Sequence, residues 1–293
     1  MIPHPERILY PEIGLVRAEL ALYYHHVAAP LLEHLHDRPL TVRRWPEGLS
    51  GPGFYQRYRH QRGAAPRPIV IETVGDLMAW VGVGVIEFHS PLGRRQDHGR
   101  HDWAVMDLDP HPPAGWPELV RVAGVVLALL ARCEIPAALK TSGADGLHIF
   151  LPIRPTDPHE VEAAMERVAR VVTLAVPEQA TVTRRVADRG PRVYLDFLQN
   201  GPKRTMATVY TARAVPEARV SWPIRAQELA DGPEPFTVRT VMGRAVPPFP
   251  RGEPVDLTHA LDAAGLPPLS ELRRIPLTRA GSPGLTERGK GCR

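Results

Sequence analysis

The segment Trp103–Asp109 constrains the fold of this chain most. Apolar and acidic residues alternate toward its end, as in a β-strand with one buried face, and Pro110 ends the segment. In a β-strand, residues two apart point to the same face, roughly 6.5–7 Å apart along the backbone. One face is then expected to be buried by Ala104, Met106 and Leu108. Asp107 and Asp109 project together from the other face. Because two such carboxylates repel each other unless a cation lies between them, they predict a Mg²⁺ or Mn²⁺ site, with solvated loop acids as the alternative.

Helical and strand-like segments mix along the chain without strict alternation. Apolar residues at helical spacing predict helices over residues 16–35, 74–83, 116–133 and 158–174. Short alternating or apolar runs predict strands over residues 40–45, 54–58, 69–73, 85–89, 138–141, 147–152 and 192–198. This mixture predicts an α+β fold, with mostly antiparallel sheets flanked by helices.

A third acid lies inside another apolar strand. Asp196 interrupts Arg192–Leu198, where an unpaired carboxylate is costly to bury. One interpretation is a partner for a buried arginine. The other is a third carboxylate that faces Asp107 and Asp109 across adjacent strands. Three carboxylates on a sheet surface can hold two cations about 3.5–4 Å apart, one for an attacking hydroxyl and one for a triphosphate.

A turn with two glycines follows the strand over residues 138–141. Gly143 and Gly146 allow positive φ and close backbone approach, so free N–H groups can face a phosphate. Ser142 supplies a hydroxyl, and His148 supplies a charge-assisted donor when a polyanion keeps it protonated. A plain hairpin turn is the alternative interpretation.

Two arginines flank a further strand-like run over residues 205–210. Arg204 precedes this run and Arg213 follows it, downstream of Asp196. Guanidinium groups suit phosphate, so both are candidates for a triphosphate clamp, with solvated surface positions as the alternative.

Composition limits the classes of protein. Lys+Arg 36 against Asp+Glu 32 gives a net charge of +4, which suits a nucleic-acid binder without establishing one. The two cysteines, Cys133 and Cys292, lack metal-ligand spacing, and with no signal-peptide pattern they predict a reducing cytoplasm. The longest apolar run, Leu119–Ala131, is too short to span a membrane.

Three motifs occur in a specific order: Asp-Leu-Asp-Pro at 107–110, Thr-Ser-Gly-x-x-Gly-Leu-His at 141–148 and Asp-x-x-Gln-Asn at 196–200. This order resembles the archaeo-eukaryotic primase superfamily. More closely, it resembles the polymerase domain of bacterial DNA ligase D, the end-joining polymerase that works with Ku. The resemblance extends from about Arg7 to Leu229, and the stretches 38–48 and 53–56 also match it.

The resemblance implies a primase-like catalytic core and a set of site residues. It implies that the ligands of two Mn²⁺ or Mg²⁺ ions are Asp107, Asp109 and Asp196. It implies contacts to an NTP or dNTP from Ser142, His148, Gln199, Arg204, Arg213 and His89. The 5′-phosphate of a gap or broken end is expected to bind Arg43, Arg7 and Arg17. Bases of the template are expected to stack on Phe54 and Tyr55, at about 1–3 kcal/mol per base.

The chain departs from the family pattern at Asp145, where the family has Lys. The change removes a cation beside the triphosphate, and we expect it to weaken nucleotide binding. For the domain organisation we expect a polymerase domain over residues 1–277. Within it we expect a DNA-end-binding subregion of about 1–90 and a catalytic core of about 85–240, followed by a disordered tail over 278–293.

The expected function is a template-dependent polymerase that adds nucleotides to a primer 3′-OH at gaps or double-strand breaks, in non-homologous end joining or gap-filling repair. The expected partners are DNA ends or a gapped duplex with a 5′-phosphate, Ku and a separate ATP-dependent DNA ligase. A separate ligase is expected because the chain has no Lys-x-Asp-Gly motif. We expect no membrane association and a cytoplasmic location at the nucleoid.

Three alternatives stay open. The first is a stand-alone primase or repair polymerase without Ku, and the second is a catalytically weak DNA-end-binding module, which Asp145 favours. The third is a His-metal hydrolase. It is disfavoured because no histidine has Glu at metalloprotease spacing and the candidates lie in different elements, at His25, His26, His34, His36, His98 and His101.

Overall fold

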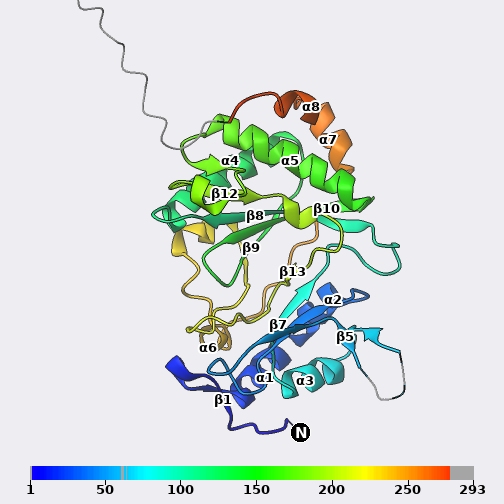
Figure 1. The fold of residues 1–293 in the computed structure, drawn as a ribbon, viewed down its shortest axis with the longest axis vertical. Helices are drawn as coiled ribbons and strands as arrows, with labels where there is room; N and C mark the ends of the chain where they lie inside the picture. The colour runs from blue at the N-terminus through cyan, green and yellow to red at the C-terminus, as the bar shows by residue number, and fades with distance from the viewer. Residues whose placement is uncertain (1, 61–62, 64, 278–293) are drawn as a thin grey trace, which may run out of the picture.

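This computed structural model describes residues 2–60, 63 and 65–277. The fold contains two main sheets, each covered by helices (Figure 1). The larger sheet has the order β11 (Ala180–Thr181), β12 (Val193–Asp196), β8 (His101–Pro110), β10 (Leu147–Thr156), β9 (Ala138–Thr141) and β14 (Pro223–Ile224). The smaller sheet has the order β13 (Met206–Ala207), β7 (Val85–Ser90), β3 (Thr41–Arg44) and β4 (Phe54–Gln56). Every pair is antiparallel except β11 with β12, which confirms the expected α+β class.

Two long helices cover one face of the larger sheet (Figure 1). They are α4 (Trp116–Arg132) and α5 (Pro158–Ala175). The Glu118 carboxylate accepts from the Gly115 N–H at the start of α4, and Asp157 caps α5. Their apolar stripes pack on Ala104, Met106 and Leu108, as the alternation of β8 predicts. The side chains of Asp107 and Asp109 therefore lie on the opposite face, toward the smaller sheet.

The smaller sheet is covered by α1 (Arg17–His26), α2 (Ala28–Leu35) and α3 (Val74–Gly82). One helix was expected over residues 16–35, and the structure divides it at Val27. Pro30 explains the break, because it has no N–H to donate to the carbonyl of His26 and cannot continue an unbroken helix.

Two expected strands differ most from the structure. Residues 69–73 form no strand, although Ile69 makes a single bridge with Leu40. The buried Ile69 and Ile71 produced the apolar pattern without a sheet partner. The run over residues 205–210 contains only the two-residue β13, because the chain then turns at Tyr210, whose φ is +63°.

Smaller elements complete the described part of the chain. Two hairpins consist of β1 (Ile8–Tyr10) with β2 (Leu15–Val16), and β5 (Tyr58–Arg59) with β6 (Arg67–Pro68). Short C-terminal helices are α6 (Val238–Val241), α7 (Leu257–Ala263) and α8 (Leu269–Leu272), of which the last two pack against α5. The expected tail over 278–293 lies outside the described residues, and the subregions 1–90 and 85–240 stay predictions.

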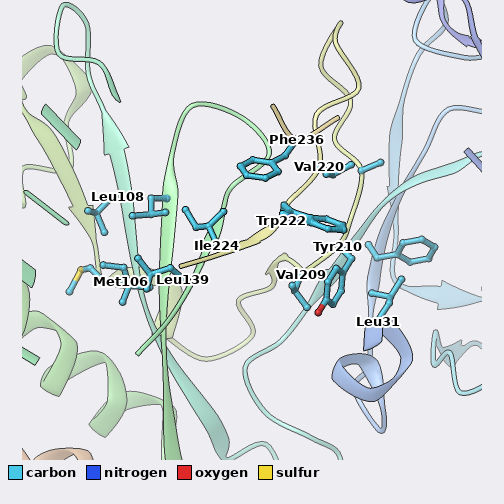
Figure 2. Close-up of a cluster of buried hydrophobic side chains, with 14 of the residues drawn as sticks. Leu31, Met106, Leu108, Leu139, Val209, Tyr210, Val220, Trp222, Ile224 and Phe236 are labelled. Atoms are coloured by element: carbon cyan, nitrogen blue, oxygen red, sulfur yellow. The ribbon is translucent and has the colours of Figure 1, made fainter. Parts of the chain in front are cut away.

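A continuous apolar core joins the two sheets. Figure 2 shows Trp222 and Tyr210 between Leu108 of β8 and Leu31 of α2. The rings of Tyr210 and Trp222 meet edge to face, with centroids 5.8 Å apart. The Tyr23 hydroxyl donates to Tyr210 O, which fixes the segment that leads on to Arg213. None of the described helices is long and apolar enough to cross a membrane.

Candidate nucleotide and metal site

The carboxylates meet on neighbouring strands. Asp196 of β12 pairs in register with Asp107 of β8, and Tyr194 pairs with Asp109. On the other side of β8, His148 of β10 also pairs with Asp107. Next along, Lys140 of β9 pairs with His148. Four strands therefore carry one transverse row of chemically active side chains, and of these the sequence analysis missed Lys140.

The ionised forms of Asp107 and Asp109 are disfavoured by burial and by like charges nearby. Burial raises the pKa of Asp107 well above its usual value, and the charges of Asp109 and Asp196 raise it further. Burial and then Asp196 also raise the pKa of Asp109. Oδ1 of Asp107 is buried and accepts no hydrogen bond from the described part of the chain, although His148 Nε2 lies 3.3 Å away. An unsatisfied anionic oxygen among like charges fits a divalent cation with oxygen ligands.

The carboxylate of Asp196 accepts hydrogen bonds from residues close to it in the sequence. It accepts from Leu198 N at 3.0 Å, from Gln199 Nε2 at 2.9 Å and from the Tyr194 hydroxyl at 3.3 Å. Within residues 2–60, 63 and 65–277, no three His, Cys, Asp or Glu side chains form a closed metal-binding group. The assignment of all three acids as metal ligands stays a prediction.

The turn after β9 is organised by Ser142. Its Oγ accepts from the N–H groups of Ala144 and Gly146, both at 3.0 Å. These two N–H groups are thus used inside the turn, contrary to the expectation that they face a phosphate. With its lone pairs engaged, the Ser142 hydroxyl keeps its hydrogen as a donor. Gly143 adopts φ +74°, which favours glycine.

His148 is held by a buried lysine. Lys140 Nζ lies 2.6 Å from His148 Nδ1, 3.0 Å from Ala207 O and 2.7 Å from Ser221 Oγ. The Ser221 hydroxyl donates to Thr141 O, so it accepts from Lys140. Burial lowers the pKa of Lys140, but these three acceptors match the three hydrogens of an ammonium group.

The state of the imidazole follows from this contact. Burial, then Lys140 and Arg213, hold the pKa of His148 well below its usual value. His148 is therefore neutral here, and its protonation beside a polyanion stays a prediction. Because Nδ1 accepts from Lys140, its hydrogen is on Nε2, which faces Asp107.

The two arginines of the expected clamp differ. Arg213 donates from Nη1 to Ser142 O at 2.6 Å and from Nε to Glu87 Oε1 at 3.3 Å. Arg213 therefore lies between the turn of the larger sheet and strand β7 of the smaller one. Arg204 is exposed to solvent, and its nucleotide contact stays a prediction.

Glu87 is a second residue that the sequence analysis missed. It is buried, and it accepts from His89 Nε2 at 2.9 Å and from Ala214 N at 2.8 Å, with Arg43 3.8 Å away. Burial alone raises its pKa, but His89, Arg213 and the Ala214 N–H outweigh burial and lower the pKa to about 2. Glu87 thus connects the expected nucleotide and end-binding residues. The sequence signal for Glu87 is an acidic residue inside the apolar run 85–89, the same kind of signal that marks Asp196 in its own strand.

The expected end-binding residues form two groups. Arg7 and Arg17 both donate to Pro46 O, and Arg17 is almost fully buried. The guanidinium of Arg43 lies over the Tyr55 ring, 5.2 Å from its centroid. The Phe54 and Tyr55 side chains of β4 are 45% and 62% exposed, and the guanidinium of Arg44 lies over the Phe54 ring, 5.2 Å from its centroid, so a base can reach only the part of each ring that its arginine leaves open. Their DNA contacts stay predictions.

The relationship of this fold to known proteins follows from three comparisons. The family model described as LigD, primase-polymerase domain, matches residues 16–247. The chain belongs to this family. The expected resemblance and the primase-like catalytic core are therefore confirmed. The acids of β8 and β12 and the turn between β9 and β10 all lie inside the matched range.

The relatives are longer proteins. The multifunctional non-homologous end joining protein LigD of Mycolicibacterium smegmatis is 29% identical over 248 residues, which cover 78% of this chain and 32% of that protein. The corresponding protein of Pseudomonas aeruginosa is 28% identical over 242 residues, covering 78% and 29%. The chain thus spans about a third of the length of these curated relatives.

One solved structure matches nearly the whole chain. It is the polymerase domain of Mycobacterium tuberculosis ligase D in complex with DNA, with a TM-score of 0.72 and 24% identity. The match covers 94% of this chain and 99% of that one. At this identity the likeness establishes the fold.

Proposed function

We propose that this chain is a template-dependent nucleotidyltransferase that adds NTPs to a primer 3′-OH at DNA gaps or double-strand breaks. The observation that carries the proposal is the register of Asp196 and Asp107, beside the turn that bears Ser142 and His148. Membership of the LigD primase-polymerase family supports it. The relatives' names place those proteins in non-homologous end joining, and we extend that process, or gap-filling repair, to this chain.

Two Mn²⁺ or Mg²⁺ ions, held by Asp107, Asp109 and Asp196, would supply Lewis-acid stabilisation of the charge that develops during phosphoryl transfer. The side chains of this protein then have defined tasks. The Ser142 hydroxyl and the Nε2–H of His148 donate to phosphate oxygens.

Arginines and a glutamine complete the proposed nucleotide contacts. Arg213 and Arg204 offset the negative charge of the triphosphate. Gln199 and His89 complete the pocket near the sugar and the base. Gln199 must exchange its hydrogen bond to Asp196 for one to the nucleotide. Such donor groups are worth more in a buried site than in water.

The DNA side of the proposal rests on the smaller sheet. Arg43, with Arg7 and Arg17, binds the 5′-phosphate of the gap or end. Phe54 and Tyr55 stack on the template, which their exposure allows. We propose Ku and a separate ATP-dependent ligase as partners, and a cytoplasmic location at the nucleoid.

Primer extension on a gapped, 5′-phosphorylated duplex with Mn²⁺ tests the proposal. We expect the wild type to extend the primer and Asp107→Ala to lose at least about a hundredfold in rate, because one metal ligand is missing. A duplex without the 5′-phosphate should be extended more slowly by the wild type. Equal extension by the two proteins would refute the assignment.

A second function, a DNA-end-binding module with weak catalysis, is favoured by the acidic Asp145 in the turn. The same gapped duplex distinguishes the two functions. Tight binding of the duplex by the wild type, without incorporation of any nucleotide, would support the binding module and contradict the polymerase.

A further inference from the structure

Two arginines from one hairpin contact the same turn. Arg213 and Arg219 are paired through the backbone, with Arg213 N donating to Arg219 O at 2.9 Å, next to the bridge between Ala212 and Val220. Arg213 Nη1 donates to Ser142 O at 2.6 Å. Arg219 Nη1 donates to Ala144 O at 3.0 Å. Both guanidinium groups therefore lie against the turn that carries the proposed phosphate donors.

Arg219 also forms an ion pair with Asp145, the residue at which the chain departs from the family pattern. Its Nη1 lies 3.0 Å from Asp145 Oδ1. The Arg219 side chain is 14% exposed, whereas that of Asp145 is 80% exposed. The next residue, Gly146, lies against the carboxylate site, because a Cβ atom there would be 3.0 Å from Asp109 Oδ1.

The two arginines differ in how their charge is balanced. Arg213 faces the buried Glu87, which stays ionised because its pKa is about 2. Arg219 faces Asp145 and, at 3.6 Å, Glu217, both of which are exposed. Its Nε is buried and makes no hydrogen bond among the described residues. An exposed carboxylate screened by water binds a guanidinium weakly, so a triphosphate can displace it.

We propose that Arg219 binds the triphosphate of the incoming NTP and that Asp145 holds its guanidinium beside the turn until the nucleotide arrives. The inference rests on the proposed function. Arg219 supplies the positive charge that the turn lacks. When the nucleotide binds, the Asp145 carboxylate leaves its ion pair with Arg219 and is hydrated instead. Planar guanidinium groups suit this task because they present several donors to one phosphate.

Nucleotide binding measured by calorimetry tests the proposal without turnover, with ATP and Ca²⁺ and no primer. We expect Arg219→Ala to weaken ATP binding about tenfold or more, the usual effect of losing a charge-assisted hydrogen bond. Asp145→Ala should bind ATP as tightly as the wild type or tighter. The double variant Arg219→Ala/Asp145→Ala should stay as weak as Arg219→Ala.

Two outcomes overturn the inference. If Arg219→Ala binds ATP like the wild type, Arg219 makes no contact with the phosphates. If the double variant regains wild-type affinity, Arg219 acts only by neutralising Asp145. Should Arg219→Ala fail to fold, Arg219→Gln keeps the side chain as far as the position of Nε but removes the charge, and unchanged ATP binding by this variant also overturns the inference.

The matched control is Arg121→Ala. Arg121 is an exposed arginine paired with Glu118 at 2.6 Å on α4, which covers the opposite face of the sheet, and its loss should leave ATP affinity unchanged. The outcomes for the two proposals are distinguishable. A wild type that binds ATP through Arg219 but extends no primer contradicts the proposed function alone. A wild type that extends primers while Arg219→Ala binds ATP normally contradicts this inference alone.

Discussion

Gly146 lies directly against the carboxylate of Asp109. A Cβ atom at position 146 would be 3.0 Å from Asp109 Oδ1 and 2.7 Å from Leu108 O. The space beside the acid pair is therefore available only because the turn has no side chain at this point. The close approach joins the proposed phosphate-binding turn to the proposed metal site.

Gly146→Ala should consequently displace Asp109 and reduce primer extension by about a hundredfold, because a shift of about 1 Å is enough to lose that much rate. The measurement is single-turnover extension with saturating Mn²⁺. Gly124→Ala is the matched control. Gly124 lies in α4 with open space around it, so alanine there should leave the rate unchanged and stabilise the fold by about 0.5–1 kcal/mol. Normal extension by Gly146→Ala would show that Asp109 tolerates displacement.

Glu87→Gln should destabilise the protein in a pH-dependent way. Its pKa falls from 4.5 to about 2 on folding, which corresponds to about 3 kcal/mol in favour of the ionised folded state. Because the folded pKa is lowered, this stabilisation is complete above about pH 4.5 and is lost as the pH falls toward 2. Urea unfolding of both proteins at pH 7 and pH 3 measures it. A difference that does not shrink at pH 3 would contradict the electrostatic explanation.

Asp107→Asn should raise the thermal stability of the metal-free protein while it abolishes extension. The pKa of Asp107 is raised on folding, so the ionised acid opposes folding above its usual range near 3.8. The stabilising effect of the substitution should therefore appear at pH 8 in EDTA and disappear near pH 3. Thermal unfolding at the two pH values gives the comparison, and a lower Tm for the variant at pH 8 would exclude repulsion among the acids.

Lys140→Met should change the imidazole tautomer of His148. Without the Lys140 contact, Nδ1 loses its donor and the hydrogen no longer favours Nε2. Nitrogen-15 NMR of the histidine side chains, assigned with His148→Gln, should detect Nε2–H in the wild type and a mixture in the variant. ATP affinity should fall in parallel. A wild-type ring with its hydrogen on Nδ1 is the result that this account excludes.

The local pattern of the sequence predicted the parts of the site that lie within single strands. Alternation in β8 placed Asp107 and Asp109 on one face, and the apolar setting of Asp196 marked it as unusual. The contacts of Glu87, Lys140 and Arg219 depend instead on which strands become neighbours. Lys140 reaches His148 only through the register of β9 with β10. That register depends on the packing of the whole sheet.

The elements that were wrongly expected also fail for reasons outside the local sequence pattern. Helical periodicity over residues 16–35 predicts one helix, but the periodicity of apolar residues does not register the missing N–H of Pro30, which divides it. The buried Ile69 and Ile71 match a strand pattern, but among the described strands none pairs with both. Burial and pairing are separate requirements, and the sequence pattern reports only the first.

The most direct test of the account is anomalous diffraction from crystals grown with Mn²⁺ and a non-hydrolysable NTP analogue. We predict manganese between the carboxylates of Asp107, Asp109 and Asp196, with the triphosphate against Ser142 and His148. A well-bound analogue elsewhere on the protein, or an absence of manganese at these acids, would contradict the central claim.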